Sequence, residues 1–217
     1  MIKLCIFDLD GTLTNTLPAI SHFGNTALCK NGFGEISMDR YRYLVGDGRD
    51  LLIHRMLAES GNDTLENFKK VAKSYDEAYE ADPLYKTAPY DGIAELLKAL
   101  KEQGTILCVL SNKPDNVVQE IVRLFFGDTF THSMGHLPSH NIKPDPEAAL
   151  MLCEKCVVLP ADTMFIGDTD VDIKTGKNAG MKTCGVLWGF REKEELMAAG
   201  ADYIAENPMD IFNKFLK

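Results

Sequence analysis

The residues best suited to chemistry lie near the N-terminus, where two aspartates follow a short apolar run. Asp8 and Asp10 are separated by a single residue, and Gly11 comes directly after them. Because side chains alternate along an extended chain, both carboxylates would point the same way and repel each other unless a cation binds them. Hard oxygen ligands suit Mg²⁺, which prefers one or two carboxylates together with water and substrate phosphate. Taken alone, the pair also fits a charged strand end that turns at Gly11.

Polar residues also follow two later apolar runs. Residues 105–110 lead into Ser111 and Asn112. Residues 163–166 lead, after one glycine, into Asp168. The carboxyl ends of parallel strands meet at one edge of a sheet, and open α/β folds bind their ligands there. We therefore expect a third carboxylate, a hydroxyl and an amide to converge on the first pair.

A lysine and a further aspartate complete the expected site. Lys143 stands in a loop before one helical pattern, and Asp172 stands at the start of another. A lysine, a hydroxyl and free backbone N–H groups beside carboxylates suit a phosphoryl group. Asp172 equally fits the helix dipole, and Ser111 and Asn112 equally fit helix caps. We expect Lys113 to lie on the surface.

The periodicity of the chain predicts an α/β fold with a helical insert. From about residue 90 onward, helical and strand patterns alternate, which is typical of a Rossmann-like parallel sheet with helices on both faces. Between the first strand and that point the apolar residues repeat at helical spacing, with no convincing strand. We predict an α/β core domain of residues 1–14 and 84–217, and a small helical domain of residues 15–83. The predicted helices of the insert cover residues 18–29, 38–45, 50–60 and 65–80.

Composition narrows the class of protein. The chain has 217 residues, 45% of them hydrophobic, and a formal net charge of -9, which argues against non-specific binding to nucleic acid or anionic membranes. No apolar run approaches membrane-spanning length, and the first residues lack the apolar region and cleavage site of a signal peptide. Six cysteines, including Cys153 and Cys156 in a helical pattern, fit reduced thiols better than disulfides or zinc ligands. We expect a cytoplasmic protein and predict no oligomeric state.

Four motifs in order resemble the haloacid dehalogenase superfamily. They are Asp8-Leu9-Asp10-Gly11-Thr12, Ser111-Asn112-Lys113, Lys143-Pro144 and Gly167-Asp168-Thr169-Asp170-Val171-Asp172. Residues 89–93 and 186–190 look similar to the phosphoglycolate phosphatase-like branch of that superfamily. The resemblance spans nearly the whole chain, and it implies that the helical insert is the cap domain of that branch.

The resemblance also implies a role for each motif. Asp8 would be the nucleophile that forms an aspartyl-phosphate, and Asp10 would be the general acid and then the general base. Mg²⁺ would be the cofactor, and small phosphate esters would be the substrates. The implied metal ligands are Asp8, the backbone carbonyl of Asp10, Asp168 and, directly or through water, Asp172. The implied phosphate-binding residues are Ser111, Asn112 and Lys143.

One loop of the insert is a candidate for contact with the substrate. Gly46 and Gly48 flank Asp47, and Arg49 follows. In proteins similar to this one, such a loop closes over the substrate. The two glycines would let the backbone approach a small ligand, and Arg49 would meet an anionic group. A plain turn between helices with an exposed arginine is the alternative.

The sequence therefore favours a Mg²⁺-dependent phosphatase acting on a small phosphomonoester, with phosphoglycolate as the first choice. Asp10 argues against a dehalogenase or a phosphonate hydrolase, because the resemblance implies that both lack this carboxylate. A sugar-phosphate mutase similar to β-phosphoglucomutase keeps both aspartates and stays open. A pyrophosphatase or a nucleotidase of the same superfamily also stays open. A phospho-ligand binding module without activity is the distant alternative.

Overall fold

The computed structural model describes residues 1–82 and 84–216 and divides into two compact units. The core unit contains Met1–Asn15 and Ala88–Lys217, and the helical unit contains Thr16–Thr87. These units divide after residues 15 and 87, whereas the sequence analysis places the domain boundaries after residues 14 and 83. Pro83 itself lies outside the described residues.

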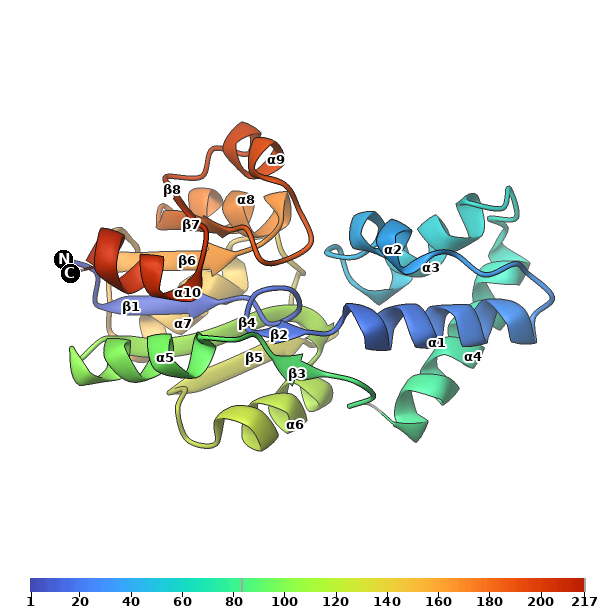
Figure 1. Ribbon diagram of the computed structural model, residues 1–217, viewed down its shortest axis with the longest axis horizontal. Coiled ribbons are helices and arrows are strands. Elements are labelled where there is room, and N and C mark those ends of the chain that lie inside the picture. The colour runs from blue at the N-terminus through green and yellow to red at the C-terminus, as the bar shows by residue number, and fades with distance from the viewer. Residues whose placement is uncertain (83, 217) are drawn as a thin grey trace. The chain divides into compact units, whose positions relative to one another are not determined.

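A six-stranded parallel sheet forms the centre of the core unit (Figure 1). The strand order is β5-β4-β1-β6-β7-β8. Phe7 at the end of β1 pairs with Val109 of β4 and with Ile166 of β6, so β1 lies between these two strands and runs parallel to both. The predicted parallel sheet is therefore confirmed. The strands are β1 (Leu4–Phe7), β4 (Ile106–Pro114), β5 (His132–His136), β6 (Thr163–Gly167), β7 (Lys182–Val186) and β8 (Tyr203–Ala205).

Helices cover both faces of this sheet. In Figure 1, α5 and α10 lie in front of the sheet and α7 lies behind it. Successive residues of β1 face opposite sides, and on one side Leu4 and Ile6 join a buried cluster with Ala149 and Leu152 of α7. The core-unit helices are α5 (Ile93–Glu102), α6 (Asp115–Phe126), α7 (Glu147–Cys156), a 3-10 turn (Pro160–Asp162), α8 (Asp170–Asn178), α9 (Lys193–Ala198), α10 (Pro208–Asp210) and a π-helix (Ile211–Leu216).

A second sheet of two short strands was not predicted. In it, β2 (Thr14–Asn15) pairs in antiparallel fashion with β3 (Ala88–Pro89). Both strands have two residues, which is too short for any alternation of apolar and polar residues to be visible in the sequence. They join the two chain segments that connect the core unit to the helical unit.

The helical unit contains the four helices that the sequence predicted. Their cores are apolar and aromatic: Phe23 lies edge-on to the Tyr79 ring at 5.0 Å, and Tyr41 is fully buried. A side chain at Gly24 would collide with the Tyr41 ring. Glycine therefore lets the helix that contains it lie close to the helix that contains Tyr41. The helices are α1 (Leu17–Lys30), α2 (Met38–Leu44), α3 (Arg49–Ala58) and α4 (Leu65–Ala81).

All six cysteines carry free thiols, as expected. Cys153 and Cys156 belong to α7, and the Cys156 sulfur lies 3.6 Å from the Cys108 sulfur. Among the helices of residues 1–82 and 84–216, none combines the length and the apolar composition needed to cross a membrane.

Candidate functional site

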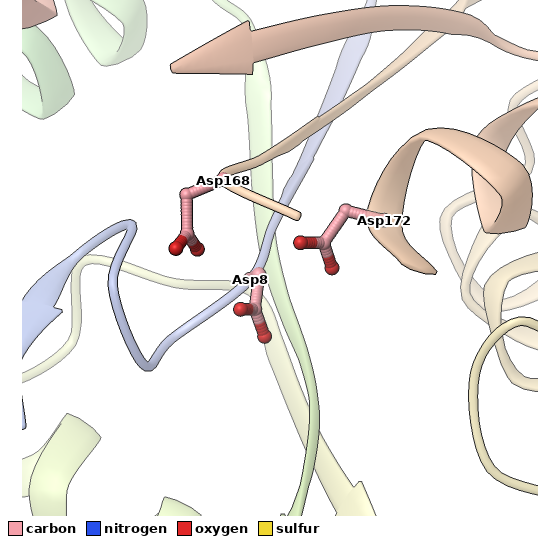
Figure 2. Close-up of side chains that lie close together, drawn as sticks. All are labelled: Asp8, Asp168 and Asp172. Atoms are coloured by element: carbon pink, nitrogen blue, oxygen red, sulfur yellow. The ribbon is translucent and has the colours of Figure 1, made fainter. Parts of the chain in front are cut away.

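Three buried aspartates converge at the carboxyl edge of the parallel sheet (Figure 2). Asp8 follows β1, Asp168 follows β6, and Asp172 lies in the first turn of α8. One carboxylate oxygen from each residue lies within 4.8 Å of the other two. Such groups repel one another away from water, and their oxygens form the donor set that Mg²⁺ prefers. The geometry therefore fits a divalent cation.

Asp168 is held by the loop that follows Asp10. Its Oδ1 accepts a hydrogen bond from the Thr12 hydroxyl at 2.9 Å, and its Oδ2 accepts one from the Phe190 N–H at 2.8 Å. Gly11 has φ +89°, and a side chain there would collide with the Asp168 carboxylate. Burial, together with the charge of Asp172, raises the pKa of Asp168 to about 7. The Asp-Gly-Thr order of the motif thus has a local reason: glycine leaves room for the carboxylate that threonine binds.

Asp172 serves the helix and the site at once. Its Oδ2 accepts hydrogen bonds from the Thr169 N–H at 3.0 Å and the Thr169 hydroxyl at 2.8 Å, which forms a capping box at the start of α8. Its Oδ1 accepts a hydrogen bond from Lys143 Nζ at 2.7 Å. The sequence left a first-turn carboxylate favoured by the helix dipole and a site residue as alternatives for Asp172. The structure places it both in the first turn of α8 and in the carboxylate cluster.

Lys143 is the positive charge inside this cluster. Its ammonium donates to Asp8 Oδ1 and to Asp172 Oδ1, each at 2.7 Å, and the residue is 4% exposed. Burial opposes the charged form, but the nearby charges of Asp172 and Asp8 outweigh it and raise the pKa of Lys143 above its usual range. For Asp8, burial raises the pKa, and the charge of Lys143 acts in the opposite direction. When all three carboxylates are ionised, their charge (−3) and that of the ammonium (+1) give a net −2, which matches a divalent cation.

Ser111 and Asn112 lie inside the last part of β4, not at the start of a helix. The Asn112 side chain binds the backbone of Lys143 in both directions: Oδ1 accepts from its N–H at 2.8 Å, and Nδ2 donates to its carbonyl at 3.1 Å. Ser111 Oγ accepts from the Lys113 N–H at 3.3 Å. Pro114 is the N-cap of α6 and makes no side-chain cap hydrogen bond, so the capping alternative was wrong. Asn112 instead fixes the loop that carries Lys143.

Lys113 is not on the surface, and this expectation was wrong. Its side chain is 7% exposed, and its ammonium donates to Asp10 Oδ1 at 3.0 Å and Oδ2 at 2.9 Å. Asp10 lies outside the cluster of three aspartates. The pairing arises because β4 is the neighbour of β1, so the residue after Ser111 and Asn112 reaches the loop after Asp8. The signal available in the sequence was the strand-end position of Lys113 itself.

The Gly46–Arg49 loop lies in the helical unit. Gly46 has φ +121° and Gly48 has φ +86°, both in the region that favours glycine. The Arg49 guanidinium binds both carboxylate oxygens of Asp76 on α4, with Nε at 2.9 Å from Oδ1, and also binds Asp50. Arg49 therefore ties the start of α3 to α4, and a substrate anion would compete with two carboxylates for it.

Comparisons with known proteins agree on one family. The model of the haloacid dehalogenase-like hydrolases matches residues 5–186. The phosphoglycolate phosphatase of Mannheimia succiniciproducens is 32% identical over 215 residues, covering 96% of each chain. The N-acetylmuramic acid 6-phosphate phosphatase of Pseudomonas aeruginosa is 30% identical over 218 residues, covering 98% of this chain and 94% of that one. The crystal structure of a predicted phosphoglycolate phosphatase from Haemophilus somnus 129PT has a TM-score of 0.88 at 32% identity, covering 97% of this chain and 96% of that one.

Proposed function

This chain belongs to the haloacid dehalogenase-like hydrolase family and is a phosphatase, and we propose that it hydrolyses a small phosphomonoester with Mg²⁺ through an aspartyl-phosphate on Asp8. The observation that supports this most is the buried group of Asp8, Asp168 and Asp172, with Lys143 bound to two of them. A nucleophilic carboxylate attacking phosphorus needs charge compensation and fixed geometry, and this group offers both.

The metal ion is assigned to the carboxylates. Asp8, Asp168 and Asp172, together with the backbone carbonyl of Asp10, would hold Mg²⁺. When bound, Mg²⁺ supplies positive charge and polarises a phosphoryl oxygen. The net −2 charge of the cluster and its oxygen donors support this assignment.

The proposed reaction has two steps. In the first, an Asp8 carboxylate oxygen forms a bond to phosphorus while the bond from phosphorus to the leaving oxygen breaks. Asp10 gives its proton to that leaving oxygen. In the second, Asp10, now a carboxylate, takes a proton from water as the water oxygen attacks phosphorus, which releases inorganic phosphate and restores Asp8. Lys143, Ser111 and Asn112 would bind the phosphoryl oxygens, and the Asn112 side chain would also hold Lys143 in place.

Phosphoglycolate is the first choice of substrate. The Mannheimia relative is named a phosphatase of phosphoglycolate and the Pseudomonas relative a phosphatase of N-acetylmuramic acid 6-phosphate, at nearly the same identity to this chain. Both names describe phosphate esters of organic acids. We therefore place carboxylate-bearing phosphate esters ahead of neutral sugar phosphates, nucleotides and pyrophosphate. The cap loop of Gly46, Gly48 and Arg49 is proposed to contribute to this choice.

A substrate panel tests the proposal. Phosphate release would be measured with Mg²⁺ and with EDTA on phosphoglycolate, N-acetylmuramic acid 6-phosphate, glucose phosphates, nucleoside monophosphates and pyrophosphate. We expect Mg²⁺-dependent release, with the highest kcat/KM on a carboxylate-bearing ester. Absence of release from every compound would overturn the hydrolase assignment. Isomerisation of β-glucose 1-phosphate without release of phosphate would establish the mutase instead.

Location belongs to the same proposal. We propose that the protein acts in the cytoplasm on a small soluble ester, without a nucleic-acid or membrane partner. The net charge of -9 supports weak affinity for polyanions. Fractionation of cells that express the chain at native level would check this, and recovery with the membrane fraction would contradict it.

A further inference from the structure

We propose that Lys113 is a positioning residue for Asp10, orienting its carboxyl for proton transfer to the leaving group. This inference rests on the proposed function, in which Asp10 is the acid. The Lys113 ammonium contacts both Asp10 oxygens, at 3.0 and 2.9 Å, across 103 residues of sequence. A contact to both oxygens fixes the direction in which the carboxylate points.

The backbone that carries Lys113 is closely packed and hydrogen-bonded. Its backbone N–H donates to Ser111 Oγ at 3.3 Å, inside strand β4. On the other side, a side chain at Gly135 of β5 would collide with the Lys113 carbonyl, so the two backbones pack closely. Gly135 N–H also donates to Asp115 Oδ1 at 2.8 Å, a second link between these two chain segments. An ammonium on such a base is better suited to fix a partner than one on a loop.

Asp10 needs this support because of where it lies. Its side chain is 19% exposed, and it follows Asp8 in the loop after β1, outside the cluster of three aspartates. The two side-chain torsions of an aspartate allow several directions in a partly open site. Lys143 already binds Asp8 and Asp172, so two separate lysines bind two separate sets of carboxylates. Lys113 thereby keeps Asp10 apart from the cluster and available to the substrate.

The bidentate contact is compatible with the acid role. In the acid form of Asp10, one oxygen carries the proton that goes to the leaving group. The other oxygen still accepts a hydrogen bond from Lys113. Proton transfer then depends on the orientation that Lys113 imposes. General acid catalysis is worth roughly 10²- to 10⁴-fold in rate, and a misdirected acid forfeits much of that.

The leaving group supplies the test. An alkyl phosphate, such as the best ester of the substrate panel, needs its leaving oxygen protonated, whereas p-nitrophenyl phosphate does not. The parameter kcat/KM covers the steps up to departure of the leaving group, so it reports the acid role alone. We expect Lys113→Met to lower kcat/KM about 10²-fold on the alkyl ester and less than about 3-fold on p-nitrophenyl phosphate. Lys113→Arg should recover most of the loss.

Two further comparisons keep the test sharp. Lys113→Met combined with Asp10→Ala should lose no more than Asp10→Ala alone, because residues that act as a unit are not additive. Lys98→Met, which removes a lysine with a 77% exposed side chain on α5, should match the wild type on both substrates. Should Lys113→Met fail to fold by circular dichroism, Lys113→Gln takes its place with the same expectations.

Equal losses on both substrates, or additive losses with Asp10→Ala, would overturn the positioning role while leaving the phosphatase assignment intact. A wild-type protein that hydrolyses neither substrate would overturn the proposed function, and this inference with it. The two failures are therefore distinguishable.

Discussion

The core unit and the helical unit both pair basic side chains with carboxylates, but in different surroundings. In the core, the Lys143 and Lys113 side chains are 3% and 7% exposed. In the helical unit, the Arg49 side chain is 30% exposed, and its partners Asp76 and Asp50 are 48% and 69% exposed. The Lys143 and Lys113 side chains are thus shielded from water, whereas the pairs of Arg49 are in contact with it.

The difference in burial distinguishes the charged groups that we assign to function from those on the surface. Charges in the interior interact strongly because little water screens them, but each also carries a large desolvation cost. Burying three aspartates and a lysine therefore lowers the stability of the fold. Such a group is expected where it performs a function that an apolar core cannot. The pairs of Arg49 are screened, and exposed pairs contribute about 0.2 to 1 kcal/mol each. We place the chemistry in the core group, and the Arg49 pairs join α3 to α4.

The largest expected effect is on the nucleophile. Asp8→Asn keeps the size of the side chain but removes the nucleophilic charge, so we expect turnover to fall by about 10⁴-fold or more. The fold should stay intact, as judged by circular dichroism. Phosphate release on the best ester of the panel is the measurement. Activity near that of the wild type would show that Asp8 is not the nucleophile. The buried group of the core unit would then no longer differ in function from the pairs of the helical unit.

Removal of the buried cation should have the next largest effect. Lys143→Met leaves Asp8 and Asp172 buried without their partner, and breaking a buried pair in this way costs about 3 kcal/mol or more. The free energy of unfolding in urea is the measurement. Lys174→Met is the matched control, because it breaks a pair with Asp170 on the surface of the same unit and should cost less than about 1 kcal/mol. Similar losses in both variants would remove the distinction between buried and exposed pairs.

The buried carboxylates also predict how stability depends on pH in the absence of metal. Asp168 has a pKa of about 7 when folded, against an ordinary 3.8, because burial disfavours its charge. Between these values the folded chain holds a proton that the unfolded chain has released. The contribution of Asp168 to stability is therefore full below about pH 4 and is lost as the pH rises to about 7. Asp8, whose pKa is also raised, acts in the same direction.

Urea unfolding in EDTA between pH 4 and pH 8 would measure this slope. Asp168→Asn should flatten it, and saturating Mg²⁺ at pH 8 should raise the stability of the wild type but not of the variant. An identical slope in wild type and variant would contradict the assignment of the slope to Asp168.

The same contrast explains what the sequence could predict. Residues that sit at strand ends, such as Asp8 and Asp168, were located because the periodicity gave the strands and a parallel sheet gathers their ends. The pairing of Lys113 with Asp10 depends on which strands are neighbours, and this is information about topology that no local pattern holds. The prediction of Asn112 as a phosphate ligand rests on its motif. Its bonds to the Lys143 backbone could not be predicted, because they depend on a loop 31 residues away.

The helical unit was predicted in outline but not in contacts. Its four helices follow from apolar residues at helical spacing. The partner of Arg49 could not be read, because Asp76 lies 27 residues further along the chain and an exposed pair leaves no trace in the hydrophobic pattern. The two-residue strands β2 and β3 were not predicted for a related reason, because the pairing between Thr14 and Pro89 is set by the whole fold.

The smallest expected effect concerns the Arg49 pairs and tests the other side of the comparison. Arg49→Gln removes the charge that binds Asp76 and Asp50, and we expect a loss of less than about 1 kcal/mol in the free energy of unfolding, because these pairs are exposed. If Arg49 only joins α3 to α4, Asp76→Asn should have a similar effect on stability and on KM. If Arg49 also binds the substrate, Arg49→Gln should raise KM severalfold while Asp76→Asn, which frees the guanidinium, should lower it. Opposite shifts in KM would therefore make this exposed arginine part of the site, and equal shifts would confine it to the surface structure of the helical unit.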